Sequence, residues 1–306
     1  MIAVILRRLM LGVVTIACVY TLTFLMVITI PGNPLRQSDR NLPPEAEQAL
    51  RVRYNMDNNW LYFRQFIVGA VHGDFGPTFT YADWTCSQII ADALPVSVVL
   101  GFLAVLFAVV VGVPLGVISA VKRGGALDLA SLSLVLTCMS LPTFVTGSGL
   151  LIVFGVYLQW APVGGWGTVA HLPLPALTLS LPFIAYIARL TRAGMLDVLG
   201  SDFIRTALAK GVSRQSAVWN HALRVAFLPV LSYLGPAMAQ AMTGSFVVEK
   251  VFGVPGLGQH FVNAALNLDA GLILACVLVY STILVAFNLV VDVLYGWLDP
   301  RIAGAV

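Results

Sequence analysis

The sequence predicts an all-α integral membrane protein with six transmembrane helices. The mean hydropathy is +0.91, and 59% of the 306 residues are hydrophobic while only 10% are charged. Soluble domains contain about 25% charged residues, so this composition cannot cover a water-soluble surface. Apolar runs without acidic or basic residues also recur at the length of about 20 residues that a helix needs to cross a bilayer.

The uncharged runs divide into six predicted spans. The stretch from residue 129 to residue 188 contains no Asp, Glu, Lys or Arg and is too long for one span. A segment rich in Gly, Pro and Trp at 157–175 divides it into two. The first run of the chain is too long for a signal peptide and lacks its cleavage site, so we expect an uncleaved span. The predicted spans are Leu9–Ile30, Pro95–Val121, Leu129–Val156, Leu174–Ala188, Ala226–Val248 and Ala270–Val291.

Basic residues gather on one side of this six-span arrangement. Eleven of the 17 Lys and Arg residues lie there, whereas the short loops on the other side contain only Lys250. The other five lie in the long loop at 31–94, where charge has little influence on orientation. Because positive residues mark the cytoplasmic side, we expect both termini in the cytoplasm. The eleven residues are Arg7, Arg8, Lys122, Arg123, Arg189, Arg192, Arg205, Lys210, Arg214, Arg224 and Arg301.

The predicted organisation has three parts. Residues 1–94 form the first transmembrane helix and a large external loop. Residues 95–294 form a core of five transmembrane helices, with a cytoplasmic loop at about 197–225. Residues 295–306 form a cytoplasmic tail.

The external loop contains a predicted helix of its own. Apolar residues recur there at helical spacing, at Trp60, Phe63, Ile67, Val68 and Val71. This pattern is typical of a helix that lies on the membrane or on the spans. It is also compatible with a rim that touches an external partner.

The loop between the fourth and fifth spans contains a predicted short amphipathic helix. Ser201 or Asp202 can cap its start, and Gly211 can end it in the left-handed conformation. Ser213 can cap a second helix that leads into the fifth span. A helix of this kind suits a groove on another protein, or it could lie on the inner leaflet. Its apolar stripe consists of Phe203, Ile204, Ala207 and Leu208.

This segment resembles the E-A-A-x3-G loop of the permeases of ATP-binding cassette (ABC) importers. It is most similar to the R-T-A-x-A-K-G variant of the dipeptide, oligopeptide and nickel permeases. Arg205, Thr206 and Ala207 fall at the E-A-A positions and Gly211 at the glycine. The chain departs from the wider family pattern I-x-L-P at His221–Arg224. The resemblance implies an ATPase-coupling helix formed by Asp202, Phe203, Ile204, Arg205, Thr206, Ala207, Leu208, Ala209, Lys210 and Gly211.

The resemblance covers essentially the whole chain and is closest to the B-type transmembrane subunit of oligopeptide permeases. Further matching stretches are the opening Ile5–Leu9 with Ile30–Pro34, the external His72–Pro77, the segment Val247–Gln259 and the ending Leu298–Ile302. It implies the type I ABC importer permease fold and a place in a bacterial cytoplasmic membrane.

The implied function is ATP-driven import of oligopeptides by alternating access. The implied partners are a second, homologous permease in a heterodimer, two cytoplasmic subunits that bind ATP and Mg, and an external peptide-binding protein. Nickel is an alternative substrate within the same family. The sequence does not define peptide length or preference, or which residues line the translocation path.

Several functions lack the sequence features that they require. The three lysines, at 122, 210 and 250, are followed by Arg, Gly and Val, so no G-K-[ST] phosphate loop occurs. We therefore expect no enzymatic site, and no metal or cofactor site, in this chain. No basic run interleaved with aromatic residues indicates a nucleic-acid partner. The four cysteines form no C-x-x-C pair, and among them only Cys86 is expected to lie outside the spans, on the external side.

The main alternative from another class is an ion-coupled secondary transporter. Such transporters usually need a carboxylate or a broken helix near the middle of the bilayer. No charged residue lies in the middle of a predicted span. Prolines do interrupt the spans, as fixed kinks or as hinges, at Pro114, Pro142, Pro182 and Pro236.

Overall fold

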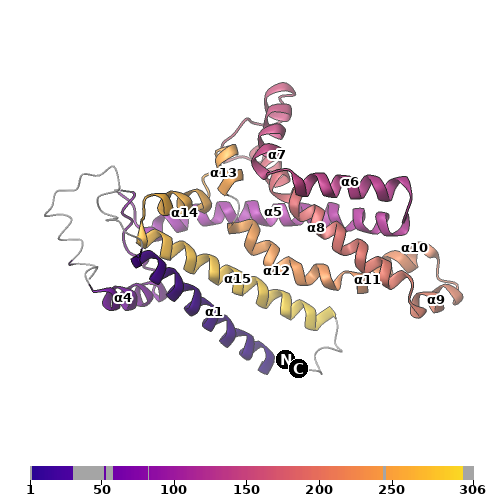
Figure 1. The fold of residues 1–306 in the computed structure, drawn as a ribbon, viewed down its shortest axis with the longest axis horizontal. Coiled ribbons are helices and arrows are strands. Elements are labelled where there is room, and N and C mark those ends of the chain that lie inside the picture. The colour runs from indigo at the N-terminus through magenta and orange to yellow at the C-terminus, as the bar shows by residue number, and fades with distance from the viewer. Residues whose placement is uncertain (1, 30–51, 53–57, 82, 244–245, 299–306) are drawn as a thin grey trace. The chain divides into compact units, whose positions relative to one another are not determined.

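The computed structural model describes residues 2–29, 52, 58–81, 83–243 and 246–298. Within these ranges the regular structure is helical, apart from one isolated β-bridge between Pro77 and Thr85. Figure 1 shows the helices in chain order. They are α1 (Ile2–Thr29), α4 (Asn59–Val71), α5 (Cys86–Val121), α6 (Ala126–Ser140), α7 (Thr143–Leu150), the π-helix η1 (Leu151–Tyr157), the 3-10 helix η2 (Val169–His171), α8 (Pro173–Leu199), α9 (Asp202–Ala209), α10 (Arg214–Ser216), the π-helix η3 (Ala217–Ala222), α11 (Leu223–Ala226), α12 (Leu228–Thr243), α13 (Phe246–Phe252), α14 (Leu257–Leu266) and α15 (Ala270–Leu298).

The number of membrane-crossing helices agrees with the sequence. Parts of α1, α5, α8 and α15 are long and apolar enough to cross a bilayer alone. Two helix pairs also pass this test but are bent, by 105° between α6 and α7–η1 and by 54° between α10–α11 and α12. If each bent pair is one span, the number of spans is the predicted six.

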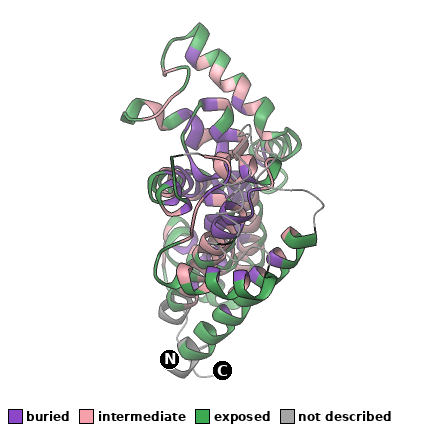
Figure 2. Ribbon diagram, turned by 90° about the vertical axis from the view of Figure 1, so that its left-hand side faces the viewer, coloured by how far each residue is buried: buried purple, intermediate pink, exposed green. Residues whose placement is uncertain are grey.

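The third predicted span, Leu129–Val156, is bent sharply at Leu141 and Pro142. Leu141 has an extended backbone, with φ −84° and ψ 129°. A residue before proline is pushed out of the helical region by the proline ring, so α6 ends there. The following α7–η1 arm is largely exposed, as its colours at the top of Figure 2 show. Its buried residues are Gly147 and Gly155.

Two helices extend well beyond their predicted spans. Helix α5 begins at Cys86 instead of Pro95, and α8 continues past Ala188 to Leu199. The length of a bilayer span does not limit the length of a helix, and the start of α5 packs in a hydrophobic cluster through Cys86, Ile89 and Ile90. The predicted boundary between residues 94 and 95 therefore falls inside α5.

The chain packs as two compact units. The first contains residues 98–254 and the chain after 287, and the second contains residues 2–97 and 255–286. The functional division into an accessory N-terminal part and a permease core stays a prediction.

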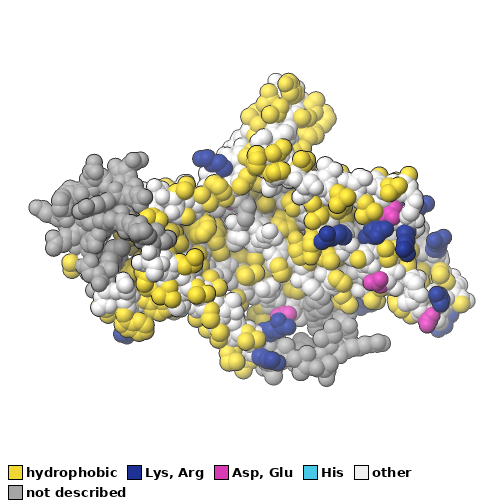
Figure 3. Space-filling model, in the orientation of Figure 1, with side chains coloured by type: hydrophobic (Ala, Val, Ile, Leu, Met, Phe, Trp, Pro, Cys, Tyr) yellow, Lys and Arg dark blue, Asp and Glu magenta, His cyan; other side chains and the backbone are white. Residues whose placement is uncertain are grey.

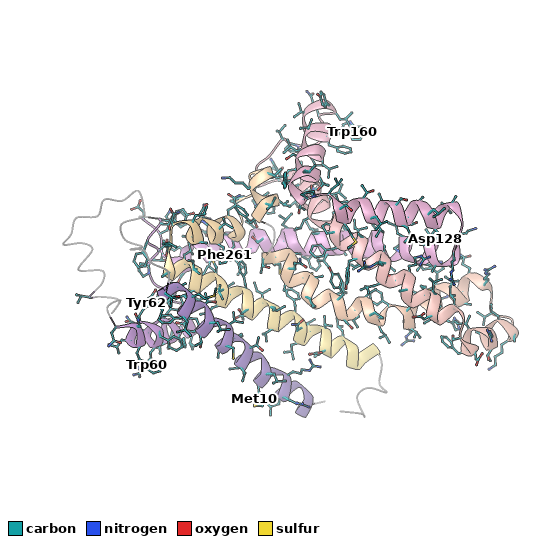
Figure 4. All side chains as sticks on the ribbon, in the orientation of Figure 1. Met10, Trp60, Tyr62, Asp128, Trp160 and Phe261 are labelled. Atoms are coloured by element: carbon teal, nitrogen blue, oxygen red, sulfur yellow. The ribbon has the colours of Figure 1, made fainter. Side chains whose placement is uncertain are left out.

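In the second unit, α4 packs on α1 through aromatic side chains. Tyr62 and Phe66 of α4 are buried with Tyr20 and Phe24 of α1, and the Tyr20 hydroxyl donates a hydrogen bond to the carbonyl oxygen of Phe63 at 3.1 Å. The predicted helix is confirmed, but its buried face differs from the predicted stripe. Three residues of that stripe, Trp60, Val68 and Val71, are exposed. Figure 4 labels Trp60 and Tyr62 on this helix.

A buried aspartate ties the segment at Thr78–Thr80 to the start of α15. Asp269 is fully buried, and its carboxylate accepts hydrogen bonds from the backbone N–H groups of Phe79 and Thr80 at 2.8 and 2.9 Å and from the hydroxyl of Thr78. Its other oxygen accepts from the N–H of Leu272 at 3.1 Å. A buried carboxylate is stable when hydrogen bonds satisfy it in this way, so this contact fixes the loop that follows the His72–Pro77 motif.

In the first unit, glycines of α5 allow close contact with α8. A Cβ atom at Gly112 would lie 2.9 Å from the carbonyl oxygen of Ile184. A Cβ atom at Gly116 would lie 2.5 Å from that of Ala188 and 2.6 Å from the Cβ of Thr191. Small residues at such crossings let the backbones of membrane helices approach.

We expect Gly116→Val to lower the stability of the permease by about 1–3 kcal/mol or more, because it overpacks a contact with the α8 backbone. Gly149→Val is the matched control, because a Cβ atom there meets nothing within 4 Å. The thermal midpoint of monodisperse protein in detergent measures the effect. Equal midpoints for both variants would contradict the close packing of α5 on α8.

Candidate ATPase-coupling segment

The segment after α8 contains the predicted short helix as α9, which begins at Asp202. Ser201 occupies the N-cap position with an extended backbone, but its hydroxyl donates to the carbonyl oxygen of Val198 at 2.6 Å and caps nothing in α9. The prediction was therefore right about the position of Ser201 and wrong about its side chain. Asp202 lies in the first turn, where a negative charge is favourable to the helix dipole.

Gly211 ends this helix in the predicted left-handed conformation, with φ +88°. Its N–H donates to the carbonyl oxygen of Leu208 at 3.0 Å, and the N–H of Val212 donates to that of Ala207 at 3.1 Å. These bonds satisfy carbonyl groups that a helix end otherwise leaves without partners. Glycine has no Cβ to oppose a positive φ, which explains its presence here.

The apolar stripe of α9 divides between an inner and an outer side. Ile204 is only 3% exposed, and α9 packs against η3. Phe203 and Leu208 are 46% and 42% exposed. Ala207 is half-buried. The helix is thus held to its own chain on one side and presents two large apolar side chains on the other.

After the turn that ends α9, helical segments lead from Arg214 toward the next span. The Ser213 hydroxyl accepts a hydrogen bond from the N–H of Ser216 at 3.3 Å, which confirms the predicted second cap. From there α10, η3 and α11 follow without a break up to Phe227, and α12 begins at the next residue. The helical segments from α10 to α11 therefore end at the 54° bend before α12.

An ion pair between a buried aspartate and a partly exposed arginine fixes the neighbouring helices at the same end of the unit. Arg192 of α8 donates from Nε to Asp128 Oδ1 and from Nη2 to Asp128 Oδ2, both at 2.9 Å. The Asp128 carboxylate also accepts from the Ser119 hydroxyl of α5 and from the N–H of Gly124 at 2.9 Å. One carboxylate thus joins the α5–α6 turn to α8. Figure 4 labels Asp128 at the start of α6.

The sequence analysis missed this pair, although the sequence contains a signal for it. Asp128 is the only acidic residue between Asp92 and Asp197. A lone carboxylate beside a long apolar run needs a partner, and Arg192 was counted only as a cytoplasmic charge.

Basic side chains gather on the end of the first unit that carries α9 (Figure 3). Arg205 lies 3.3 Å from Asp202, but both side chains are exposed. Such surface ion pairs contribute little to stability. The basic side chains at this end are therefore available for contacts with another molecule.

Comparison with known proteins assigns the family. The family model described as "Binding-protein-dependent transport system inner membrane component" matches residues 112–304. The chain belongs to this family. The matched region includes the candidate coupling segment and the Asp128–Arg192 pair, whereas α1 and α4 precede it.

Full-length relatives within this family narrow the assignment. The chain is 42% identical to the oligopeptide transport system permease protein OppB of Salmonella typhimurium and 41% identical to OppB of Escherichia coli K12, and in each case the match covers 99% of both chains. It is 38% identical to the dipeptide transport system permease protein DppB of Bacillus subtilis over 94% of both chains.

A solved structure shares the fold. A chain of the inward-facing MetNI methionine ABC transporter matches with a TM-score of 0.54 and 20% identity, over 67% of this chain and 96% of that one. The chain described here is therefore an all-α, multi-pass inner-membrane permease with the fold of ABC importer permeases.

Proposed function

We propose that this chain is one of two transmembrane subunits of an ATP-driven importer that moves oligopeptides across the bacterial cytoplasmic membrane. The observation that carries the proposal is the full-length match, at 41–42% identity, to permeases named for oligopeptide transport. Because the matches include α1, α4 and the loop between them, they extend beyond the core that the wider family shares. A dipeptide permease is also similar, which supports peptides as the substrate class.

In the proposed complex this chain contacts, directly or through its neighbours, four kinds of partner. A second, homologous permease completes a heterodimer, and two cytoplasmic subunits bind ATP and Mg. An external peptide-binding protein delivers the substrate, and the lipid bilayer surrounds the spans. We expect no ATPase site in this chain, so the energy of ATP would have to reach it through a protein contact.

Residues Asp202–Gly211 are proposed to make that contact. Phe203 and Leu208 would enter a groove of the ATPase subunit, while Ile204 holds α9 to its own chain. When ATP binding closes the ATPase subunits, the movement of α9 would pass through η3 to the bend before α12. Alternating access follows if this movement opens the cavity between the permeases to one side and closes it to the other.

The proposed orientation places both termini and α9 in the cytoplasm. The sequence predicts that Cys86 lies on the external side, where a thiol reagent could test the orientation. Its side chain is fully buried, however, and its thiol donates to the carbonyl oxygen of Pro77 at 3.2 Å. Labelling of the native thiol is therefore not expected. Exposed positions near the turns are better reporters, namely Gly125 and Thr85.

We expect an impermeant thiol reagent to label Thr85→Cys in intact cells and Gly125→Cys only after the membrane is opened. Gly125 precedes α6 beside the cytoplasmic basic residues, and Thr85 precedes α5 on the other side. Each variant serves as the control for the other. Labelling of Gly125→Cys in intact cells would reverse the orientation.

Purification of the complex in mild detergent tests the proposed function. We expect two ATPase subunits and a second permease to remain bound, and we expect peptide, presented by the binding protein, to stimulate ATP hydrolysis. Nickel is the control substrate, since nickel permeases belong to the family that the chain resembles. Stimulation by Ni²⁺ but not by peptides would overturn the substrate class and leave the permease role intact.

A further inference from the structure

The exposed surfaces of α8 and α12 differ from that of α5. Helix α5 exposes large apolar side chains along its length, among them Phe102, Leu106 and Val110. Lipid tails are as apolar as leucine, so this surface suits lipid. Helices α8 and α12 are described in full, and neither exposes a large hydrophobic side chain. Their outer surface is therefore not built to face lipid.

In the central part of α8 and of α12, the exposed residues lie on one face of the helix. Spacings of three, four and seven residues place side chains on one side of an α-helix, and the exposed positions follow them. In the central part of each helix they are Pro182 and Arg189 on α8, and Pro229, Ser232, Pro236 and Gln240 on α12.

The two faces join into one surface through a pair of tyrosines. The rings of Tyr186 on α8 and Tyr233 on α12 lie with their centroids 4.2 Å apart. The guanidinium of Arg189 lies 5.1 Å from the centroid of Tyr186. The opposite side of α8 contacts α5 at Ile184 and Ala188, so this surface points away from α5. We call it the α8/α12 face, with Pro182, Tyr186, Arg189, Ser232, Pro236 and Gln240 as its residues.

Polar groups on this face have hydrogen-bonding capacity to spare. Among the described residues, the guanidinium of Arg189 has no carboxylate partner and the amide of Gln240 has no hydrogen-bond partner. The amide of Gln240 would be costly against hydrocarbon, and Arg189 follows the end of the predicted fourth span at Ala188. Polar side chains in membrane helices normally face the bundle interior or a water-filled cavity.

We propose that the α8/α12 face is a wall of the path along which the peptide crosses the membrane. This inference rests on the proposed function. A peptide carries backbone amides and a terminal carboxylate, which match the free donors and acceptors of Gln240 and Arg189. The tyrosine rings offer surface to side chains of many kinds. Pro182 and Pro236 have compact side chains and no backbone N–H group.

A contact with the second permease is the competing role for this face. Interfaces between membrane helices are enriched in small residues that allow close approach. Apart from Ser232, the residues of the α8/α12 face are larger, namely tyrosine, arginine, glutamine and proline. Burial of Arg189 in a dry interface without an anionic partner would be unfavourable, so a wet passage suits these residues better.

Cysteine accessibility in the assembled transporter tests the proposal. In a background without the four native cysteines that still imports peptide, Ser232→Cys and Gln240→Cys are treated with a small, water-soluble thiol reagent. Both should react, and a transported peptide, delivered by the binding protein with ATP, should reduce the reaction. Phe102→Cys and Val110→Cys, on the lipid-facing side of α5, are the matched controls and should not react.

Each other outcome overturns the proposal. Unreactive cysteines at 232 and 240 would show a dry face, and their cross-linking to the second permease would assign it to that interface. Reaction without protection by peptide would show water but no peptide contact. Peptide import is measured separately in the same preparations, so a failure of the path assignment is distinguishable from a failure of the proposed function.

Discussion

The variants Phe203→Asp and Leu208→Asp are expected to abolish peptide uptake without loss of the permease from the membrane. Both side chains are large, apolar and more than 40% exposed on α9, so their replacement disturbs less internal packing than replacement of the buried Ile204 would. In the assembled transporter each would place an unpaired carboxylate in a contact with the ATPase subunit. Loss of a central apolar anchor costs about 2 kcal/mol or more in protein interfaces, which is more than tenfold in affinity.

The measurement has three parts: membrane abundance, co-purification of the ATPase subunits and uptake of a labelled peptide. Asp197→Asn is the matched control, since Asp197 is exposed on α8 near the same end of the unit but outside α9. Ala207→Glu is a poorer probe, because Ala207 is half-buried within this chain and its replacement would combine docking with folding. If both Asp variants bind the ATPase and import peptide normally, α9 is not the coupling helix.

The variant Asp128→Ala is expected to lower the stability of the permease, because it leaves the guanidinium of Arg192 without its carboxylate partner. Asp128 is 3% exposed and binds Arg192 through two hydrogen bonds. Its loss also leaves the N–H of Gly124 without this acceptor. Thermal unfolding of the purified complex measures the effect.

The double variant Asp128→Leu with Arg192→Met separates the cost of an unpaired charge from a need for the ions themselves. Replacing both members of a buried pair by apolar residues is often neutral for stability. We therefore expect the double variant to recover most of the stability that Asp128→Ala loses. A double variant as unstable as the single one would show that hydrogen bonds to Ser119 and Gly124 dominate.

The sequence was most informative where a local rule decides the structure. Periodicity and capping predicted α9, its end at Gly211 and the cap at Ser213, because each depends on residues only a few positions apart. The apolar runs identified the spans for the same reason. The predicted stripe of α4 was less successful, since helical spacing does not reveal which side of a helix meets its neighbour. Trp60 and Val71 fit the period but are exposed.

Features that join distant parts of the chain could not be derived in this way. Asp128 and Arg192 are 64 positions apart, and Asp269 lies 190 positions from Phe79. The facing tyrosines at 186 and 233 belong to different spans. Pairs of this kind are set by how helices pack, and a single sequence shows only that each group needs some partner. The 105° bend at Pro142 was partly foreseeable, because proline ends helices, but the size of the turn depends on packing.

The most direct test of the central claim is uptake of a radiolabelled oligopeptide by vesicles that contain the whole complex, with the proton and sodium gradients collapsed by ionophores. An ATP-driven importer should accumulate peptide when ATP and the binding protein are supplied, and accumulation should cease with a non-hydrolysable ATP analogue. Accumulation that requires an ion gradient and proceeds without ATP would contradict the claim and favour an ion-coupled transporter.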